Sequence, residues 1–312
     1  MADLNLLAQK IKDNIKKIII GKDEVIDLML IALFCEGHVL IEDVPGVGKT
    51  SLAYAMARSA GCSFKRIQFT PDVLPSDVTG FTMPNMKTGE FEFRPGMIMS
   101  QVILADEINR TAPKTQSALL EAMEERQVTV DGVTYPVPRP FMVMATQNPV
   151  EYIGTYPLPE AQLDRFFMRI SLGYPSPNQE VEIMTAYLSE DPKASLEAVA
   201  ETDEILSAQQ HVRTIRCAEE IKQYISNLVY RSRLNEHLTL GASPRGSISL
   251  MRASQGAAFL AGRDYVIPDD VQLTAIPVLA HRLVLKPEAR LKEMTAARVV
   301  QNILNVIRVP VI

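Results

Sequence analysis

The segment IEDVPGVGKTS, residues 41–51, constrains the fold of this chain more than any other stretch. A β-type apolar run at His38–Asp43 leads into a glycine-rich turn, and a helical pattern follows from about Lys49 to Ser59. A tight turn of this kind directs backbone N–H groups at one point, where the helix N-terminus adds partial positive charge. The segment therefore predicts a phosphate-binding loop between a strand and a helix.

The loop departs from its usual form at one position. That form has a glycine, four residues and then Gly-Lys-Ser/Thr, and Asp43 stands in place of the first glycine. We expect Asp43 to end the strand with a backbone that needs no positive φ. The Lys49 ammonium would reach the β- and γ-phosphates of ATP, and the Thr50 hydroxyl would ligate Mg²⁺. The nucleotide-binding residues predicted in the loop are Pro45, Gly46, Val47, Gly48, Lys49, Thr50 and Ser51.

A second apolar run, Val102–Ala105, ends in the carboxylates of Asp106 and Glu107. A buried strand ending in two acids is typical of a site with a metal and a base. We expect Asp106 to hold Mg²⁺ through water and Glu107 to orient and polarise the attacking water. The simpler alternative is a strand that ends in acid at the surface, which the phosphate loop upstream makes the weaker interpretation.

A third apolar run, Phe141–Thr146, ends in polar side chains. Either Thr146 or Asn148 could therefore reach the γ-phosphate or the attacking water. The Asn148-Pro149 dipeptide also favours a turn, and both interpretations can hold together.

Two further strands, expected at 65–70 and 169–172, complete a mostly parallel sheet with helices on both faces. The sequence Tyr174–Pro177 contains two prolines and marks a change to helical patterns. We therefore predict an α/β nucleotide-binding domain at residues 1–174 and an all-helical domain at 175–312. Helices are expected at 4–18, 23–37, 178–188, 218–234, 243–261, 269–281 and 292–306.

Composition excludes several classes of protein. Apolar residues make up 47% of the chain, which is enough for a buried core, and the formal net charge is −5. The three cysteines lie far apart, which disfavours a disulfide scaffold or a zinc site. The N-terminus lacks the pattern of a signal peptide, and the apolar stretch Val25–Cys35 is too short to span a bilayer. We therefore expect no integral membrane segment and a cytoplasmic protein.

Taken together, these motifs resemble those of AAA+ ATPases, and in particular of the MoxR family. The resemblance rests on five ordered strings between residues 21 and 250: GKDEVIDLMLIALFCEGHVLIEDVPGVGKTSLA, IQFTPDVLPSDVTG, FEFRPGMIMSQVILADEINRTAPKTQSALLEAMEERQVTV, PFMVMATQNPVEYIGTYPLPEAQLDRFFMRI and GASPRGSISL. It implies a P-loop AAA+ core with an insert in its second helix, followed by a helical lid.

The resemblance also implies roles for residues outside the loop. Asn148 matches the first sensor, and Arg245 matches the second sensor, carried on the lid and closing over the γ-phosphate. Arg165 is the expected arginine finger for a neighbouring subunit, with Arg169 in reserve. A finger supplied in trans requires a closed ring, and AAA+ relatives are usually hexamers.

Other implied roles concern the adenine and the client. Ile20 and Gly21 match the segment that flanks the adenine in relatives, although Lys22 stands where many members have glutamine. A hairpin strand expected at 88–96, within the insert at 72–99, and a second hairpin at Gln127–Val137 would face the ring pore and engage the client; the alternative is that both are ordinary edge hairpins.

The function predicted by the resemblance is Mg²⁺-dependent ATP hydrolysis by a chaperone-like remodeller that acts in maturation of, or cofactor insertion into, a partner protein complex. Relatives often act with a protein that carries a von Willebrand factor A domain.

The main alternative is a nucleic-acid motor or transcription regulator of the same clade, which the acidic charge and the lack of a Lys/Arg-rich run disfavour. A small-molecule kinase would leave Arg165, Asn148 and the lid unexplained, and a scaffold that scarcely hydrolyses ATP is disfavoured by the intact Glu107.

Overall fold

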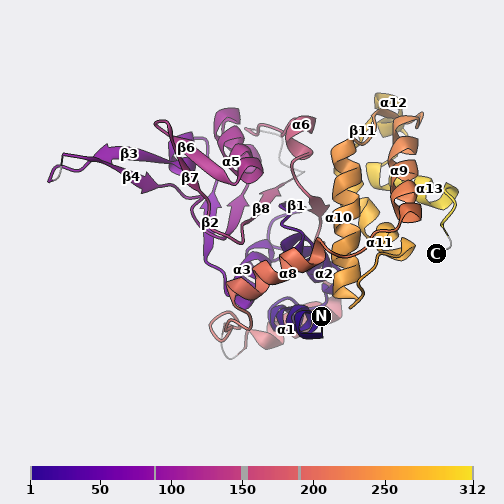
Figure 1. Cartoon of the computed structure of the whole chain (residues 1–312), viewed down its shortest axis with the longest axis horizontal. Coiled ribbons are helices and arrows are strands. Elements are labelled where there is room, and N and C mark those ends of the chain that lie inside the picture. Colours follow the sequence, from indigo (N-terminus) through magenta and orange to yellow (C-terminus); the bar gives the residue numbers. More distant parts are fainter. Residues whose placement is uncertain (1, 88, 149–153, 189–190, 311–312) are drawn as a thin grey trace.

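A parallel five-stranded sheet lies at the centre of the computed structural model, which describes residues 2–87, 89–148, 154–188 and 191–310. The strand order is β2-β5-β8-β1-β9, and every neighbouring pair is parallel (Figure 1). The strands are β1 (Val39–Glu42), β2 (Phe64–Gln68), β5 (Val102–Asp106), β8 (Met142–Gln147) and β9 (Met168–Ile170). All five lie within two residues of their predicted positions. Because the strands are parallel, their carboxyl ends meet at one edge of the sheet.

Both faces of the sheet are buried because successive side chains of a strand point to opposite faces. On β1, Val39 and Ile41 join one apolar core while Leu40 joins the other. The first core packs against α1 (Ala2–Lys16), α2 (Asp23–Phe34), α3 (Lys49–Ser59) and α8 (Thr202–Val212), and the second against α4 (Pro75–Thr79) and α5 (Pro113–Glu125).

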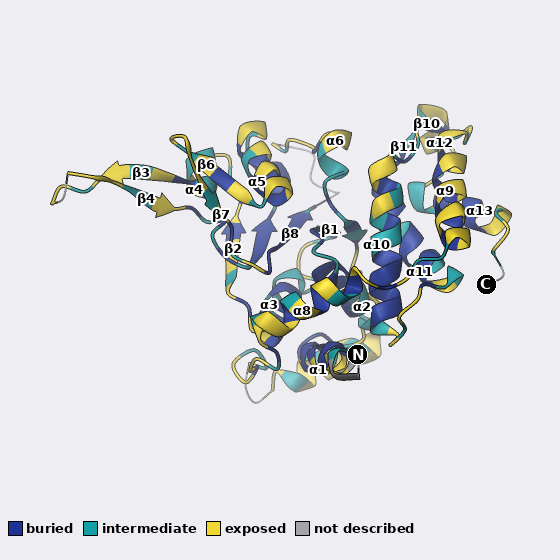
Figure 2. Cartoon of the chain, in the orientation of Figure 1, coloured by how far each residue is buried: buried dark blue, intermediate teal, exposed yellow. Residues whose placement is uncertain are grey.

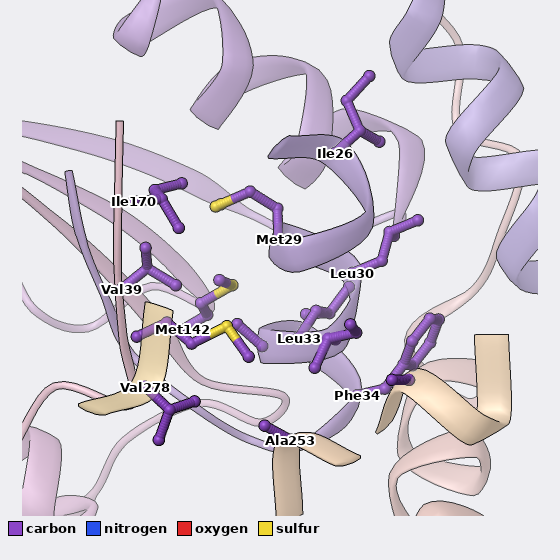
Figure 3. Packing of buried hydrophobic residues seen from close by; sticks show 14 of the residues in the cluster. Ile26, Met29, Leu30, Leu33, Phe34, Val39, Met142, Ile170, Ala253 and Val278 are labelled. Atoms are coloured by element: carbon purple, nitrogen blue, oxygen red, sulfur yellow. The ribbon is translucent and has the colours of Figure 1, made fainter. Parts of the chain in front are cut away.

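The C-terminal region is helical, as predicted, and shares the first core with the sheet. Figure 3 shows Ala253 of α10 and Val278 of α11 beside Leu33 of α2 and Met142 of β8. The helices are α7 (Pro177–Ala186), α9 (Glu219–Arg233), α10 (Pro244–Leu260), α11 (Pro268–Leu279), η2 (Ala280–Arg282), α12 (Pro287–Leu291) and α13 (Ala296–Val306). One antiparallel strand pair, β10 (Leu238–Leu240) with β11 (Val284–Leu285), was not predicted.

The helix predicted at 292–306 is shorter than expected. The Thr295 hydroxyl accepts the backbone N–H of Arg298 and so caps α13 at its start, while α12 ends at Leu291. No helix in the described part of the chain is both long and apolar enough to cross a membrane.

Two antiparallel hairpins extend from the sheet domain, and β3–β4 projects furthest from the body (Figure 1). They are β3 (Gly80–Pro84) with β4 (Phe91–Pro95), and β6 (Gln127–Val130) with β7 (Val133–Pro136). The Phe93 and Tyr135 rings stack between them with centroids 3.8 Å apart. Figure 2 shows that the projecting hairpin is largely exposed, in contrast to the buried sheet.

Candidate active site

The loop between β1 and α3 has the geometry of a phosphate-binding loop. Gly46 and Gly48 have φ of 86° and 95°, a region that favours glycine, and α3 begins directly at Lys49. The Lys49 ammonium donates hydrogen bonds to the carbonyl oxygens of Asp43 at 2.8 Å and Val44 at 3.3 Å. The lysine is therefore held across the mouth of the loop by backbone acceptors that a phosphate could replace.

The Asp43 side chain forms structural hydrogen bonds at the position where the usual loop has a glycine. Its φ is not positive, which confirms the expectation for this position. The carboxylate is buried, and its Oδ2 accepts the backbone N–H groups of Leu172 at 2.5 Å and Gly173 at 2.9 Å. Its Oδ1 accepts the N–H of Val44 at 3.1 Å. Asp43 thus ties the start of the loop to the chain that follows β9.

A cleft of about 370 Å³ brings most of the predicted site residues together at the carboxyl edge of the sheet. Thr50 from α3, Asp106 and Glu107 from the end of β5, and Asn148 after β8 all line it. The complete lining is Pro45, Gly46, Gly48, Lys49, Thr50, Arg66, Gln68, Asp106, Glu107, Thr146 and Asn148. Of the other predicted loop residues, Val47 and Ser51 are not among those lining the cleft.

Both acids are held by hydrogen bonds within the cleft. Asp106 Oδ1 accepts the Thr146 hydroxyl at 2.6 Å, and its Oδ2 accepts Arg66 Nη2 at 2.6 Å. Glu107 has φ 57° and ψ 49°, a left-handed conformation that is uncommon outside glycine and concentrates at functional sites. Its Oε2 accepts Gln68 Nε2 at 2.6 Å. The Thr146 hydroxyl also accepts the N–H of Glu107 at 2.9 Å, so Thr146 orients both acids.

Sequence analysis missed Arg66 and Gln68 on β2. They lie two residues apart, so their side chains share one face of this edge strand, and Gln68 is in register with Asp106. The signal was available in FKRIQ, where Arg66 and Gln68 flank Ile67 on a strand that ends at the predicted site.

The predicted arginines lie outside this cleft. Arg165 Nε is 3.1 Å from Glu124 Oε2, and Arg245 Nη2 pairs with Oε1 of the same glutamate. The two arginines therefore meet at the end of α5, although they come from the segment before β9 and from α10. Arg169 instead pairs with Glu42 at 2.9 Å within the sheet.

Comparisons with known proteins decide the family. Residues 38–168 match the model described as "ATPase family associated with various cellular activities (AAA)", and residues 230–303 match an AAA lid domain. The chain is 53% identical to the uncharacterized protein YeaC of Bacillus subtilis, over 99% of this chain and 97% of the relative. It is 42% identical to Chaperone MoxR1 of Mycobacterium tuberculosis, over 95% of this chain and 80% of the relative. The chain belongs to the MoxR family of AAA+ ATPases.

Structure agrees with that assignment. A solved protein from Cytophaga hutchinsonii superposes with a TM-score of 0.91 at 37% identity, covering 99% of this chain and 97% of that one. The MoxR-type ATPase core and the lid thus have the same arrangement in both proteins.

The cleft of this MoxR-family chain has the donors that Mg²⁺ prefers. Mg²⁺ is usually held by one or two protein oxygens together with substrate phosphates. The Thr50 hydroxyl and the Asp106 carboxylate line the same cleft as Lys49, so the residues present fit a nucleotide-bound Mg²⁺. Arg66 now occupies one oxygen of Asp106, as a counter-ion.

Ile20 and Gly21 lie elsewhere in the structure, at the junction with the lid. Gly21 has φ 70°, and its carbonyl accepts Gln179 Nε2 at 3.3 Å. Lys22 donates to the Tyr174 carbonyl at 3.0 Å. This segment therefore contacts the connection to α7 and is not among the residues that line the cleft. Its role at the adenine remains a prediction.

Proposed function

We propose that this MoxR-type protein hydrolyses ATP with Mg²⁺ in a ring of identical subunits. The Lys49 ammonium would leave the Asp43 and Val44 carbonyls to bind the β- and γ-phosphates, and Thr50 and Asp106 would hold the ion. Bound Mg²⁺ would neutralise charge on the phosphates. The Glu107 carboxylate would orient and polarise the attacking water, with Asn148 contacting the γ-phosphate or that water.

The observation that carries the ring proposal is the shared position of Arg165 and Arg245. Both lie outside the cleft of their own chain and both pair with Glu124, on the side where α6 (Glu160–Leu163) meets α10. Phosphoryl transfer is strongly accelerated by a cation that contacts the transferred group. We propose that the two arginines act together in the cleft of a neighbouring copy. Closing the set of such head-to-tail contacts gives a ring, for which a hexamer is our prediction.

We propose that the work of the ring is chaperone-like remodelling of a client protein complex. The projecting β3–β4 hairpin exposes four large apolar side chains to solvent by 41–93%: Phe81, Met83, Met86 and Phe91. Exposed apolar patches mark interaction sites. The name of the relative Chaperone MoxR1 supports this role. Maturation or cofactor insertion, with a partner containing a von Willebrand factor A domain, is the specific form that we propose.

The test is the rate of ATP hydrolysis per subunit as protein concentration increases. We expect the specific activity to rise with concentration in the wild type, because each site needs residues from two copies. We expect Lys49→Ala to be inactive at every concentration. Sizing in a non-hydrolysed ATP analogue should show the ring over the same concentration range.

Two outcomes would contradict the proposal. Full activity in a protein that stays monomeric with ATP analogue bound would show that the site is complete within one chain. Persistent activity in Lys49→Ala would show that the hydrolysis does not come from this loop.

A further inference from the structure

Arg282, at the end of η2, is buried at the junction between the lid and the sheet domain, with 6% exposure. Its Nε donates to Asp164 Oδ1 at 2.8 Å, and its Nη2 donates to the Phe166 carbonyl at 2.7 Å. Its Nη1 donates to the Val278 carbonyl and, at 3.3 Å, to that of Phe167. A buried guanidinium is strongly unfavourable unless its donors are satisfied, so this set of bonds holds Arg282 to the segment 164–167.

That segment carries Arg165 and belongs to neither α6, which ends at Leu163, nor β9, which begins at Met168. The N–H groups of Asp164, Arg165 and Phe166 donate to carbonyl oxygens of α6, and that of Phe167 donates to the His38 carbonyl, at 2.8–3.2 Å. Arg282 adds contacts to the side chain before Arg165 and to the carbonyl after it. Backbone bonds and the Arg282 contacts therefore fix the position of Arg165 together.

Asp164 extends the same network to the helix that carries Arg245. Its Oδ2 accepts the hydroxyl of Ser243 at 3.1 Å, and Ser243 is the residue that precedes α10. Arg245 lies in the first turn of α10, two residues later. One carboxylate thus connects the segment of the first arginine to the start of the helix of the second.

We propose that Arg282 and Asp164 form a positioning pair that presents Arg165 and Arg245 together to the neighbouring copy. The inference rests on the proposed function of those two arginines. Neither member of the pair lines the nucleotide cleft. Both act through geometry, because a displacement of about 1 Å in a catalytic group can reduce the rate by about 100-fold. Since Arg282 lies between α11 and the sheet domain, movement of the lid would displace both arginines at once.

The network leaves room for substitution. A cavity of about 650 Å³ opens beside Asp164, Ser243 and Arg282. Because asparagine has nearly the same shape as aspartate, Asp164→Asn requires no repacking there. Burial lowers the pKa of Arg282 to about 10, with Asp164 opposing the shift, so the guanidinium is still charged at neutral pH.

The experiment compares Arg282→Met and Asp164→Asn with Arg263→Met. Arg263 forms a similar two-bond pair with Asp270 at the start of α11, with distances of 2.8 and 2.6 Å, and contacts neither arginine segment. For the first two variants we expect kcat to fall by about 10- to 100-fold, with ATP-analogue affinity unchanged within about twofold. For Arg263→Met we expect a comparable loss of stability with kcat retained.

Rings that contain two different variant subunits distinguish a loss of arginine positioning from a general loss of folding. A Glu107→Gln subunit cannot hydrolyse ATP but presents intact arginines. When it is mixed with Arg282→Met, hydrolysis should return, because the Arg282→Met subunit keeps an intact cleft. Verified mixed rings that stay inactive would overturn the inference, as would full kcat in Asp164→Asn. If Arg282→Met fails to fold, Asp164→Asn carries the same mixing test.

Arg165→Ala and Arg245→Ala, measured in parallel, separate this inference from the proposed function. If both variants keep full kcat, the proposal that these arginines complete a neighbour's site is wrong. If both lose activity while Asp164→Asn and Arg282→Met do not, only the positioning role is wrong.

Discussion

At the scale of single residues, the geometry of the site depends on hydrogen bonds between its polar groups. Asp43 stands where the usual phosphate-loop pattern has a glycine, and its buried carboxylate accepts three backbone N–H groups. Glu107 accepts a hydrogen bond from Gln68 on the neighbouring strand β2. Each of these contacts gives a prediction that differs from what the motif alone would suggest.

Substituting glycine at Asp43 restores the usual loop sequence, and we expect it to destabilise the protein. Leu172 and Gly173 would lose their shared acceptor, and a buried unsatisfied donor costs about 1–3 kcal/mol. The free energy of unfolding in urea should fall by about 2–4 kcal/mol for Asp43→Gly and by less for Asp43→Asn, which keeps one acceptor oxygen. An unchanged unfolding curve for Asp43→Gly would refute this role.

Gln68 restrains Glu107 in the structure, and we expect its loss to release the base. Gln68→Leu has a similar volume but no donor, so the Glu107 carboxylate would be freer to reach water. Hydrolysis without client should rise by about three- to tenfold, in line with a hydrogen bond to a charged group partly exposed to solvent. A loss of kcat as deep as that of Glu107→Gln would instead show that Gln68 holds Glu107 in its working position.

Site residues were predictable from the sequence where they follow apolar strands. Asp106 and Glu107 stand at the end of such a run, and Thr50 follows β1 through the phosphate loop, so the parallel sheet brings all three to one cleft. Arg66 and Gln68 were not predicted as site residues, because β2 is an edge strand with few apolar residues to mark it. The Glu124 partner of Arg165 and Arg245 could not be found from spacing, since three separate elements meet there.

At the scale of elements, the central strands β1, β5 and β8 were predicted because each is a short apolar run bounded by polar residues. Helices α5 and α8 and the pair β10–β11 were not predicted. The sequence TDEILSAQQHV of α8 has few large apolar residues, and its place is set by packing on α1 and α2. Strands β10 and β11 are three and two residues long and are fixed by tertiary contact.

His38 joins two elements, and we expect it to make stability depend on pH. Its Nδ1 accepts the N–H of Val143 on β8 at 3.0 Å, and its Nε2 lies 3.0 Å from the Met123 carbonyl at the end of α5. Burial lowers its pKa to about 4 from the ordinary 6.5. Between those values the unfolded chain binds a proton that the folded protein does not, so stability falls as the pH falls.

The expected size of the effect is about 2 kcal/mol in the free energy of unfolding between pH 7 and pH 5. Urea unfolding at pH 7 and at pH 5 measures this difference, and His38→Asn serves as the control that cannot titrate at this position. The free energy of unfolding of His38→Asn should depend on pH by about 2 kcal/mol less than that of the wild type. Some dependence should remain, because burial and Arg282 also hold the pKa of His281 well below its usual range. Equal pH dependence in the two proteins would contradict the assignment.

At the scale of the whole molecule, the chain has a cleft at the sheet edge and two arginines that lie outside it. The domain limits at 174 and 175, the hexamer, the client and the partner remain predictions. The shared core between sheet and lid means that the lid is anchored through α10 and α11 (Figure 3). We therefore propose that a complete site needs two copies of this chain.

The most direct test mixes Arg165→Ala subunits with Glu107→Gln subunits. Each protein alone should be inactive, the first because it lacks the finger and the second because it lacks the base. Mixed rings should regain hydrolysis, since an Arg165→Ala cleft beside a Glu107→Gln neighbour has both groups. Inactive rings of verified mixed composition would contradict a site shared between two copies. So would full activity of Arg165→Ala alone, which would make Arg66, already inside the cleft, the first candidate for the catalytic cation.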